Sequence, residues 1–193
     1  VIGYIFELIS SSLDSKLIWD NIQFIGSTGV SFGLLFFTLN YVNKKWKTHY
    51  YFIYSSAILH IVVIGIVFFF PKTPIVRINP HLFESVYFMV LLYDFGWLFW
   101  IWLIDSYLLI IISQYYLIKQ IFQQKTSKLK LQNSIFFIGN AIPLLASILG
   151  SLGLFSEYGL RDITPLGFLI SNILLTYGIL KLELFSKIGR ASC

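Results

Sequence analysis

Charged residues are scarce in this sequence. They make up only 12% of its 193 residues, while 57% are hydrophobic and the mean hydropathy is +0.78. A soluble domain carries about 25% charged residues, and a disordered segment needs low hydrophobicity. The composition therefore excludes both a soluble globular domain and a disordered chain.

Cysteine is also nearly absent, because Cys193 at the very end is the only one. This excludes internal disulfides and a cysteine-based metal site. The first residues, from Val1 on, lack the basic region, short apolar core and cleavage site of a signal peptide. We expect the chain to be a fragment of a longer protein, with 191–193 a linker or vector-derived remnant. The net charge of +5 is spread between apolar segments, which argues against nucleic acid as a partner.

Long stretches without charge are what the sequence does contain. Residues 21–43 and 131–156 carry none, and 50–71 hold only His60 as a titratable group. A helix needs about 20 apolar residues to cross a bilayer. Runs such as 61–70 are apolar on every face, which excludes a membrane β-barrel. We therefore predict an all-α, polytopic helical membrane bundle with the lipid bilayer as its surroundings.

The lysines and arginines predict the topology. Residues 44–49, 119–130 and 181–190 hold ten of the fourteen, and such basic connections face the cytoplasm. These three segments should therefore share one side, with an outside loop or interfacial segment at 72–93. We expect five full spans, one truncated span, and a cytoplasmic C-terminus in the inner (cytoplasmic) membrane. The predicted spans lie at about 1–10, 20–43, 50–70, 94–119, 133–156 and 163–183.

Asp105 lies near the middle of its predicted span, beside Ser106. Intramembrane carboxylates usually face the bundle interior and often mark proton, ion or ligand sites. The alternative is a hydrogen-bonded Asp105 that only joins two helices, with His60, Asn140 or Asn172 as its partner. His60 itself is either a structural histidine or a pH-sensitive or metal-binding group. We name Asp105, His60, Asn140 and Asn172 as ligand or signal candidates.

Other polar and aromatic residues have simpler interpretations. Glu7, like Asp105, is either a functional carboxylate or a hydrogen-bonded residue that joins helices. The functional interpretation is less favoured for Glu7, because it lies closer to the outside boundary of the membrane. Asp20 suits the N-terminus of a helix, where a carboxylate accepts free N–H groups. Four aromatic residues at the start of the fourth predicted span are expected to anchor it at the membrane interface: Trp97, Phe99, Trp100 and Trp102.

Small residues recur at a spacing of four. Gly29 and Gly33 form one pair, and two further pairs share the spacing: Ala146 with Gly150, and Gly167 with Ser171. Such residues let helix backbones approach closely. We predict that they pack helices within the bundle, with contact between two copies as the alternative. Pro143 should kink or open its helix.

No motif supports catalysis in this segment. The sequence has no P-loop, no G-x-S-x-G and no H-E-x-x-H. Its three histidines, at positions 49, 60 and 81, are not placed to accept a phosphoryl group on a cytoplasmic helix. We predict no enzymatic activity, no metal and no cofactor here.

The sequence Asp162-Ile163-Thr164-Pro165 stands at the start of the last predicted span. With this motif the chain resembles the N-terminal seven-transmembrane region of bacterial and archaeal sensor histidine kinases. In that family an Asp-aliphatic-Thr-Pro turn opens the last span, and here it corresponds to Asp162, Thr164 and Pro165. Further matching blocks occur in the family's order across the chain: 7–8, 16–26, 37–41, 96–100, 107–109, 142–143, 161–168 and 184–185.

This resemblance implies a seven-helix sensor domain whose first helix is missing and whose second is cut short. It also implies a cytoplasmic kinase or cyclase output domain in the same chain, a homodimer, and an unknown small ligand. The turn of Asp162, Thr164 and Pro165 would couple ligand contact to the last helix. From the residues alone a helix cap is the favoured interpretation, with Pro165 in the first turn. The rival functions are a small transporter or channel, and a membrane scaffold.

Overall fold

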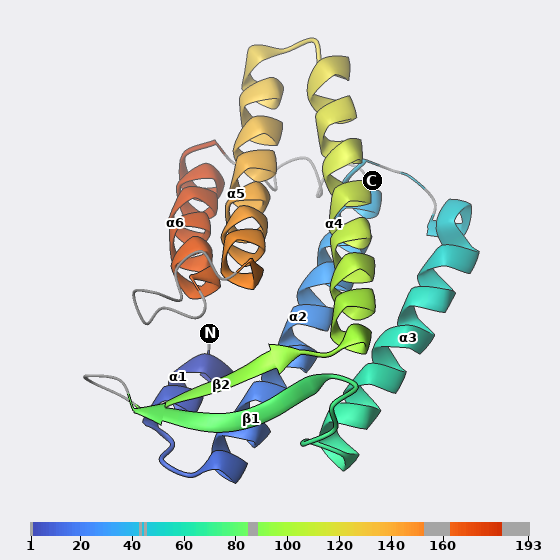
Figure 1. Cartoon of the computed structure of the whole chain (residues 1–193). Coiled ribbons are helices and arrows are strands. Elements are labelled where there is room, and N and C mark those ends of the chain that lie inside the picture. The colour runs from blue at the N-terminus through green and yellow to red at the C-terminus, as the bar shows by residue number, and fades with distance from the viewer. Residues whose placement is uncertain (1, 43, 45, 85–88, 153–162, 183–193) are drawn as a thin grey trace. The chain divides into compact units, whose positions relative to one another are not determined.

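The computed structural model describes residues 2–42, 44, 46–84, 89–152 and 163–182. The described chain is mostly helical. Figure 1 shows its helices and one β-hairpin, in the order α1, α2, α3, β1, β2, α4, α5, α6. The helices are α1 (Ile2–Ile9), α2 (Leu13–Tyr41), α3 (Tyr50–Phe69), α4 (Trp97–Gln123), α5 (Ser127–Ser151) and α6 (Thr164–Leu182), with a short 3-10 helix at Trp46–His49 before α3.

The chain divides into two compact units. Unit 1 consists of Val1–Leu34 and Trp46–Ile110, and unit 2 consists of Leu35–Lys45 and Ile111–Cys193. Helices α2 and α4 contribute residues to both. Unit 1 holds α1, α3 and the hairpin, and unit 2 holds α5 and α6.

Four of the described helices are long and apolar enough to cross a membrane: α2, α3, α4 and α5. The prediction of five full spans is therefore not supported. The helix α6 is present where the last span was expected, and it borders residues outside the described part. The short helix α1 has eight residues, far fewer than the roughly 20 needed to span.

The connection between α3 and α4 is a β-hairpin, which corrects the purely α-helical prediction. Strands β1 (Arg77–Glu84) and β2 (Met89–Phe95) pair antiparallel. The register shifts by one residue between Ile78 and His81, and Asn79 there has φ 50°. Asparagine tolerates this left-handed conformation better than most residues. The hairpin occupies most of the segment 72–93 for which a loop or interfacial segment was expected.

The core of unit 1 joins three helices and the hairpin. Eight buried side chains form it: Phe24, Val63, Val67, Val76, Leu98, Phe99, Trp102 and Leu103. The ring of Phe95 on β2 stacks on Phe99 of α4 at 3.9 Å between centroids. The junction between hairpin and α4 is tight, because a Cβ on Gly96 would overlap the backbone carbonyl of Ile75.

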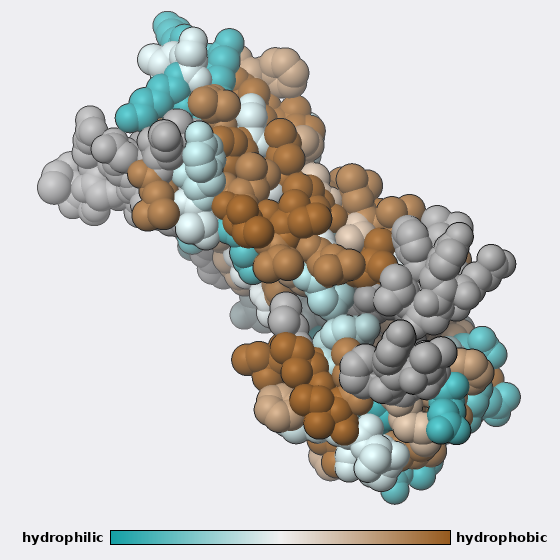
Figure 2. Space-filling view, turned by 90° about the vertical axis from the view of Figure 1, so that its left-hand side faces the viewer, coloured by the Kyte–Doolittle hydropathy of each residue, from teal (hydrophilic) through white to brown (hydrophobic). Residues whose placement is uncertain are grey.

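Apolar side chains also cover much of the surface. Exposed Ile58, Ile61 and Phe69 on α3, and Ile101 and Ile104 on α4, belong to this set. Figure 2 shows broad hydrophobic patches on the face in view. Apolar patches of this extent are rare on soluble monomers and mark interaction or membrane surfaces. The surface thus agrees with a membrane protein.

In unit 2, α5 and α6 pack closely through small residues. A Cβ on Gly167 of α6 would lie 2.8 Å from the Cβ of Ala146 and 3.1 Å from the Cα of Pro143. On Gly139 of α5 a Cβ would lie 2.8 Å from Leu175. Helix α5 continues through Pro143. The predicted close approach is therefore seen at Ala146 and Gly167.

Candidate functional site

Two of the four signal candidates meet inside unit 1. His60 of α3 and Asp105 of α4 face each other, with 3.2 Å between His60 Nε2 and Asp105 Oδ2. The His60 side chain is 1% exposed and that of Asp105 is 15% exposed. This is a close electrostatic contact rather than an aligned hydrogen bond. The other carboxylate oxygen, Oδ1, accepts a 3.0 Å bond from the Ser56 hydroxyl.

The second ring nitrogen of His60 contacts side chains of α2 and α4. Its Nδ1 lies 2.8 Å from the Thr28 hydroxyl of α2 and accepts a 3.1 Å bond from the Trp102 indole N–H of α4. An indole N–H can only donate. Nδ1 is therefore unprotonated, and the neutral imidazole carries its hydrogen on Nε2, toward Asp105.

We call these residues the His60 cluster. Its members are buried or half-buried polar and aromatic side chains of α2, α3 and α4: Thr28, Ser56, His60, Trp102, Asp105 and Ser106. They lie at helical spacings of three or four, as Ser56 with His60 and Trp102 with Asp105 and Ser106, which places each set on one helix face. Polar residues inside membrane helices are costly and commonly functional.

Trp102 corrects one sequence interpretation. It was expected to anchor at the interface, but it is buried, and so is Phe99. Trp97 and Trp100 are exposed, as an interface position requires. Hydropathy cannot separate these cases, since both are tryptophans in one apolar run. Only the polar partners on α2 and α3 identify Trp102 as interior.

The remaining two candidates do not join the cluster. Asn140 donates a 2.8 Å bond from its side chain to the carbonyl of Phe136, one turn earlier in α5. Asn172 is exposed on α6. Both belong to unit 2. Of the three partners proposed for Asp105, the structure places His60 beside it.

A second buried polar group fastens the hairpin to the helices, and we call it the Arg77 cluster: Asp20, Asn21, Arg77 and Tyr93. The Arg77 guanidinium at the start of β1 is 1% exposed and bonds Asp20 Oδ2 through Nε at 2.8 Å and a terminal nitrogen at 2.7 Å. The same terminal nitrogen donates to Asn21 Oδ1 at 2.7 Å. Tyr93 of β2 donates to the same Asp20 oxygen at 2.9 Å.

The Arg77 cluster corrects the interpretation of Asp20 as a helix cap. Helix α2 begins at Leu13, about two turns before Asp20, and the Ser12 hydroxyl accepts the Ser15 N–H at 3.2 Å as an N-cap does. Asn21 also donates to the Val67 carbonyl of α3 at 2.8 Å. The cluster therefore links β1, β2, α2 and α3.

Glu7 is also buried, and its contacts join α1 to α2. Its Oε2 accepts a 3.1 Å bond from the Gln23 amide, and its backbone carbonyl accepts one from the buried Lys16 ammonium. Phe6 stacks on Trp19 beside it, at 4.5 Å between centroids. These contacts hold α1 against the first half of α2.

The predicted coupling turn and packing residues are only partly covered. Thr164 and Pro165 form the first turn of α6, while Asp162 lies outside the described residues. Gly150 is half-buried in α5. Among the described residues, no heavy atom lies within 4 Å of a Cβ built on Gly29 or Gly33. The packing role predicted for that pair stays a prediction.

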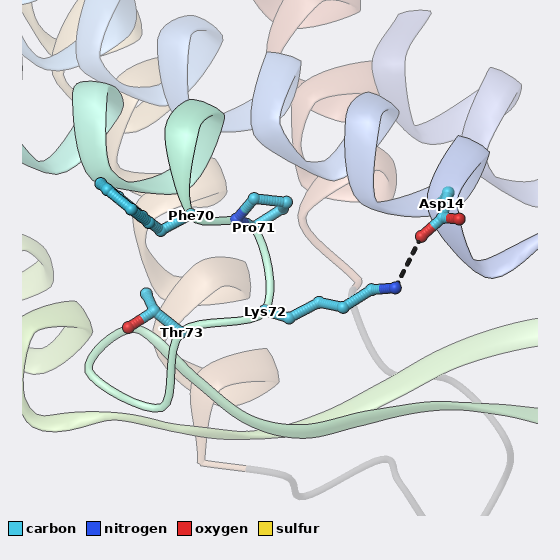
Figure 3. Close-up of a pocket in the computed structure, with 5 residues that line it drawn as sticks. All are labelled: Asp14, Phe70, Pro71, Lys72 and Thr73. Atoms are coloured by element: carbon cyan, nitrogen blue, oxygen red, sulfur yellow. Dashed lines mark ion pairs between the residues drawn. The ribbon is translucent and has the colours of Figure 1, made fainter.

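An open pocket of about 500 Å³ lies at the end of α3. Figure 3 shows its lining by Phe70, Pro71, Thr73 and the Lys72–Asp14 pair. The pair spans 2.9 Å, with side chains 56% and 78% exposed. Exposed pairs of this kind contribute little to stability. Among the described residues, no group of three His, Cys, Asp or Glu is arranged to hold a metal ion.

Comparison with known proteins gives one finding. Residues 1–188 match a protein family described as the N-terminal 7TM region of histidine kinase. No curated protein and no solved structure matches the chain.

Proposed function

Because this chain belongs to the family of N-terminal 7TM regions of histidine kinases, we propose that it passes an extracytoplasmic or intramembrane signal through its last helix to a cytoplasmic output domain. The output domain is a histidine kinase or a cyclase in the same polypeptide. The region lies in the inner membrane with its C-terminus in the cytoplasm, and it works as a homodimer without enzymatic activity of its own.

The family match over residues 1–188 carries this proposal. The placement of polar groups supports it, because unit 1 buries the His60 and Arg77 clusters while large apolar side chains face outward. Such a bundle holds its polar contacts between helices. A signal that favours a different helix arrangement must then exchange these contacts for others.

The Arg77 cluster supports the input side of the proposal. It joins both strands of the hairpin to α2 and α3 through one buried guanidinium. A ligand that moves the hairpin would therefore move helix ends with it. Such a ligand shifts the equilibrium only as far as it binds one arrangement better than the other.

The α5–α6 contact supports the output side. Gly167 and Gly139 leave no room for a side chain between the two helices, so the position of α6 depends on its packing against α5. Interior packing responds to one added methyl group. Small changes at this contact are therefore expected to alter what α6 transmits.

The test is Gly167→Ala in the full-length protein, reconstituted in proteoliposomes. The new methyl group meets Ala146 and Pro143, so α6 must shift. We expect the autophosphorylation rate to change about fivefold or more in either direction, the lower range of allosteric coupling. Gly65→Ala is the matched control, because a Cβ on this glycine of α3 meets no described atom, and it should leave the rate unchanged.

Gly139→Ala is a second variant, for the case in which Gly167→Ala does not fold. The methyl group added at position 139 meets the side chain of Leu175, which can move more easily than the backbone. Wild-type rates in both variants, at normal membrane levels, would contradict transmission through α6. Substrate uptake by the proteoliposomes that depends on Asp105 would instead favour the transporter function.

A further inference from the structure

The His60 cluster holds an unusual charge arrangement for a membrane interior. Trp102 donates to His60 Nδ1, so the imidazole is neutral. Asp105 faces it across 3.2 Å, and a carboxylate in that position leaves the cluster with one net negative charge. Burying a net charge is costly, and uptake of one proton removes the cost.

The groups around His60 restrict where a proton can go. Helix α2 presents Thr28 and Phe32, and α4 presents Trp102, Asp105 and Ser106. Of these described neighbours only Asp105 carries an ionisable group. The two groups therefore form one coupled acid–base pair.

We propose that the His60 cluster is a proton-binding site and that the proton is a ligand of the sensor. A hydronium ion gives its proton to the lone pair of His60 Nδ1 and leaves as water, forming an imidazolium paired with Asp105. This inference rests on the proposed function only for its output, since proton binding itself is a property of the cluster.

Binding of the proton forces a change of hydrogen bonds. A protonated Nδ1 is a donor, and it would face the Trp102 N–H, also a donor, across the 3.1 Å now bridged by their hydrogen bond. The Thr28 hydroxyl, 2.8 Å from Nδ1, can accept the new N–H instead. Thr28 is also within 3.4 Å of the Trp102 nitrogen. Trp102 therefore exchanges its bond to α3 for one to α2.

The exchange of the Trp102 hydrogen bond means that pH changes which helices are linked. In the neutral state Trp102 ties α4 to α3 through His60, and in the protonated state it ties α4 to α2 through Thr28. Protonation of Asp105 alone would keep Trp102 on Nδ1, because the imidazole would stay neutral. Trp102 thus reports which of the two groups takes the proton.

The experiment follows both groups by NMR in the chain embedded in lipid nanodiscs. Histidine ring carbon and tryptophan indole resonances are recorded between about pH 5 and pH 8, the range in which histidines titrate. His60→Gln and Trp102→Phe assign the two resonances. We expect both to move with one common midpoint.

Variants show in which direction each contact moves the His60 titration midpoint. Trp102→Phe removes the donor that favours the neutral ring, so the His60 midpoint should move to higher pH by roughly one unit, the size of one hydrogen bond. Asp105→Asn removes the partner of the imidazolium and should move it to lower pH. His81→Gln is the matched control, because His81 is exposed and contacts Asn79 in the hairpin, and it should leave the midpoint unchanged.

A His60 resonance that stays constant over this range would overturn the proposal. So would a titrating His60 with an unmoved Trp102 signal, because the proton would then reside on Asp105. Autophosphorylation of the full-length protein is measured over the same pH range. A rate that stays constant over this pH range while both resonances move would support the proton site and contradict the proton's role as a ligand of the sensor. The proposed function is tested separately by Gly167→Ala.

Discussion

At the scale of single residues, the buried ion pair of Arg77 and Asp20 differs most from ordinary surface charges. Arg77 is buried and bonds Asp20, Asn21 and the Pro71 carbonyl, and its guanidinium lies 5.1 Å from the Phe24 ring centroid. Breaking a buried pair leaves one charge without a partner, which costs much more than loss of an exposed pair. The Lys72–Asp14 pair provides the exposed comparison in the same unit.

We predict that Arg77→Met lowers the free energy of unfolding by about 3–5 kcal/mol, because the buried Asp20 carboxylate loses its cationic partner. Lys72→Met should cost less than about 1 kcal/mol, since its pair is exposed. Unfolding in detergent micelles with increasing SDS measures both. The double variant Asp20→Leu with Arg77→Met should be more stable than Arg77→Met alone. An equal decrease in the free energy of unfolding for Arg77→Met and Lys72→Met would contradict a stabilising role of the Arg77 cluster.

At the scale of elements, the hairpin and its junction with α4 are held by backbone proximity. Gly96 donates its N–H to the Val76 carbonyl at 2.9 Å, and Leu98 donates to Ile75 at 3.1 Å. The carbonyl of Ile75 occupies the space that a side chain at position 96 would need. The junction therefore requires glycine for close approach.

Gly96→Ala should destabilise unit 1 by more than about 1 kcal/mol, because overpacking forces a backbone shift. Gly65→Ala is the control: it adds the same methyl group in α3 where a Cβ meets no described atom. Its effect should be neutral or slightly stabilising, as alanine favours helix over glycine. Thermal unfolding of both proteins in nanodiscs provides the comparison. A Gly96→Ala midpoint equal to that of wild type would show that the junction can relax without cost.

At the scale of the whole molecule, the membrane topology rests on the basic connections. The hairpin follows α3, while Lys125 lies in the α4–α5 turn and Lys128 and Lys130 lie at the start of α5. From the positive-inside rule we propose that these lysines face the cytoplasm and that the hairpin lies outside.

This topology predicts opposite labelling of two introduced cysteines. In a Cys193→Ser background, which contains no other cysteine, His81→Cys should react with a membrane-impermeant maleimide in spheroplasts. Lys125→Cys, also at an exposed position, should react only after the membrane is opened. Labelling of both residues from the same side would invert or break the predicted arrangement of spans.

The helices themselves were largely predictable. The expected spans at 50–70 and 163–183 correspond to α3 at Tyr50–Phe69 and α6 at Thr164–Leu182, and the others shift by a few residues at one or both ends. Boundaries failed where a helix continued into polar sequence, as α2 does from Leu13. Hydropathy identifies the apolar segment that can cross the membrane, whereas capping residues such as Ser12 mark where the helix begins.

The sequence by itself determined that this is a helical membrane protein, where its helices lie, and to which family it is similar. These features follow from local composition, because an apolar segment in lipid must satisfy its backbone within itself. Only the tertiary structure decided that His60 meets Asp105 and Trp102, and that Arg77 meets Asp20. Those partners are 42 to 57 residues apart, and such pairings depend on which helix faces pack together. The hairpin was also decided by the tertiary structure, because each strand depends on hydrogen bonds to the other strand.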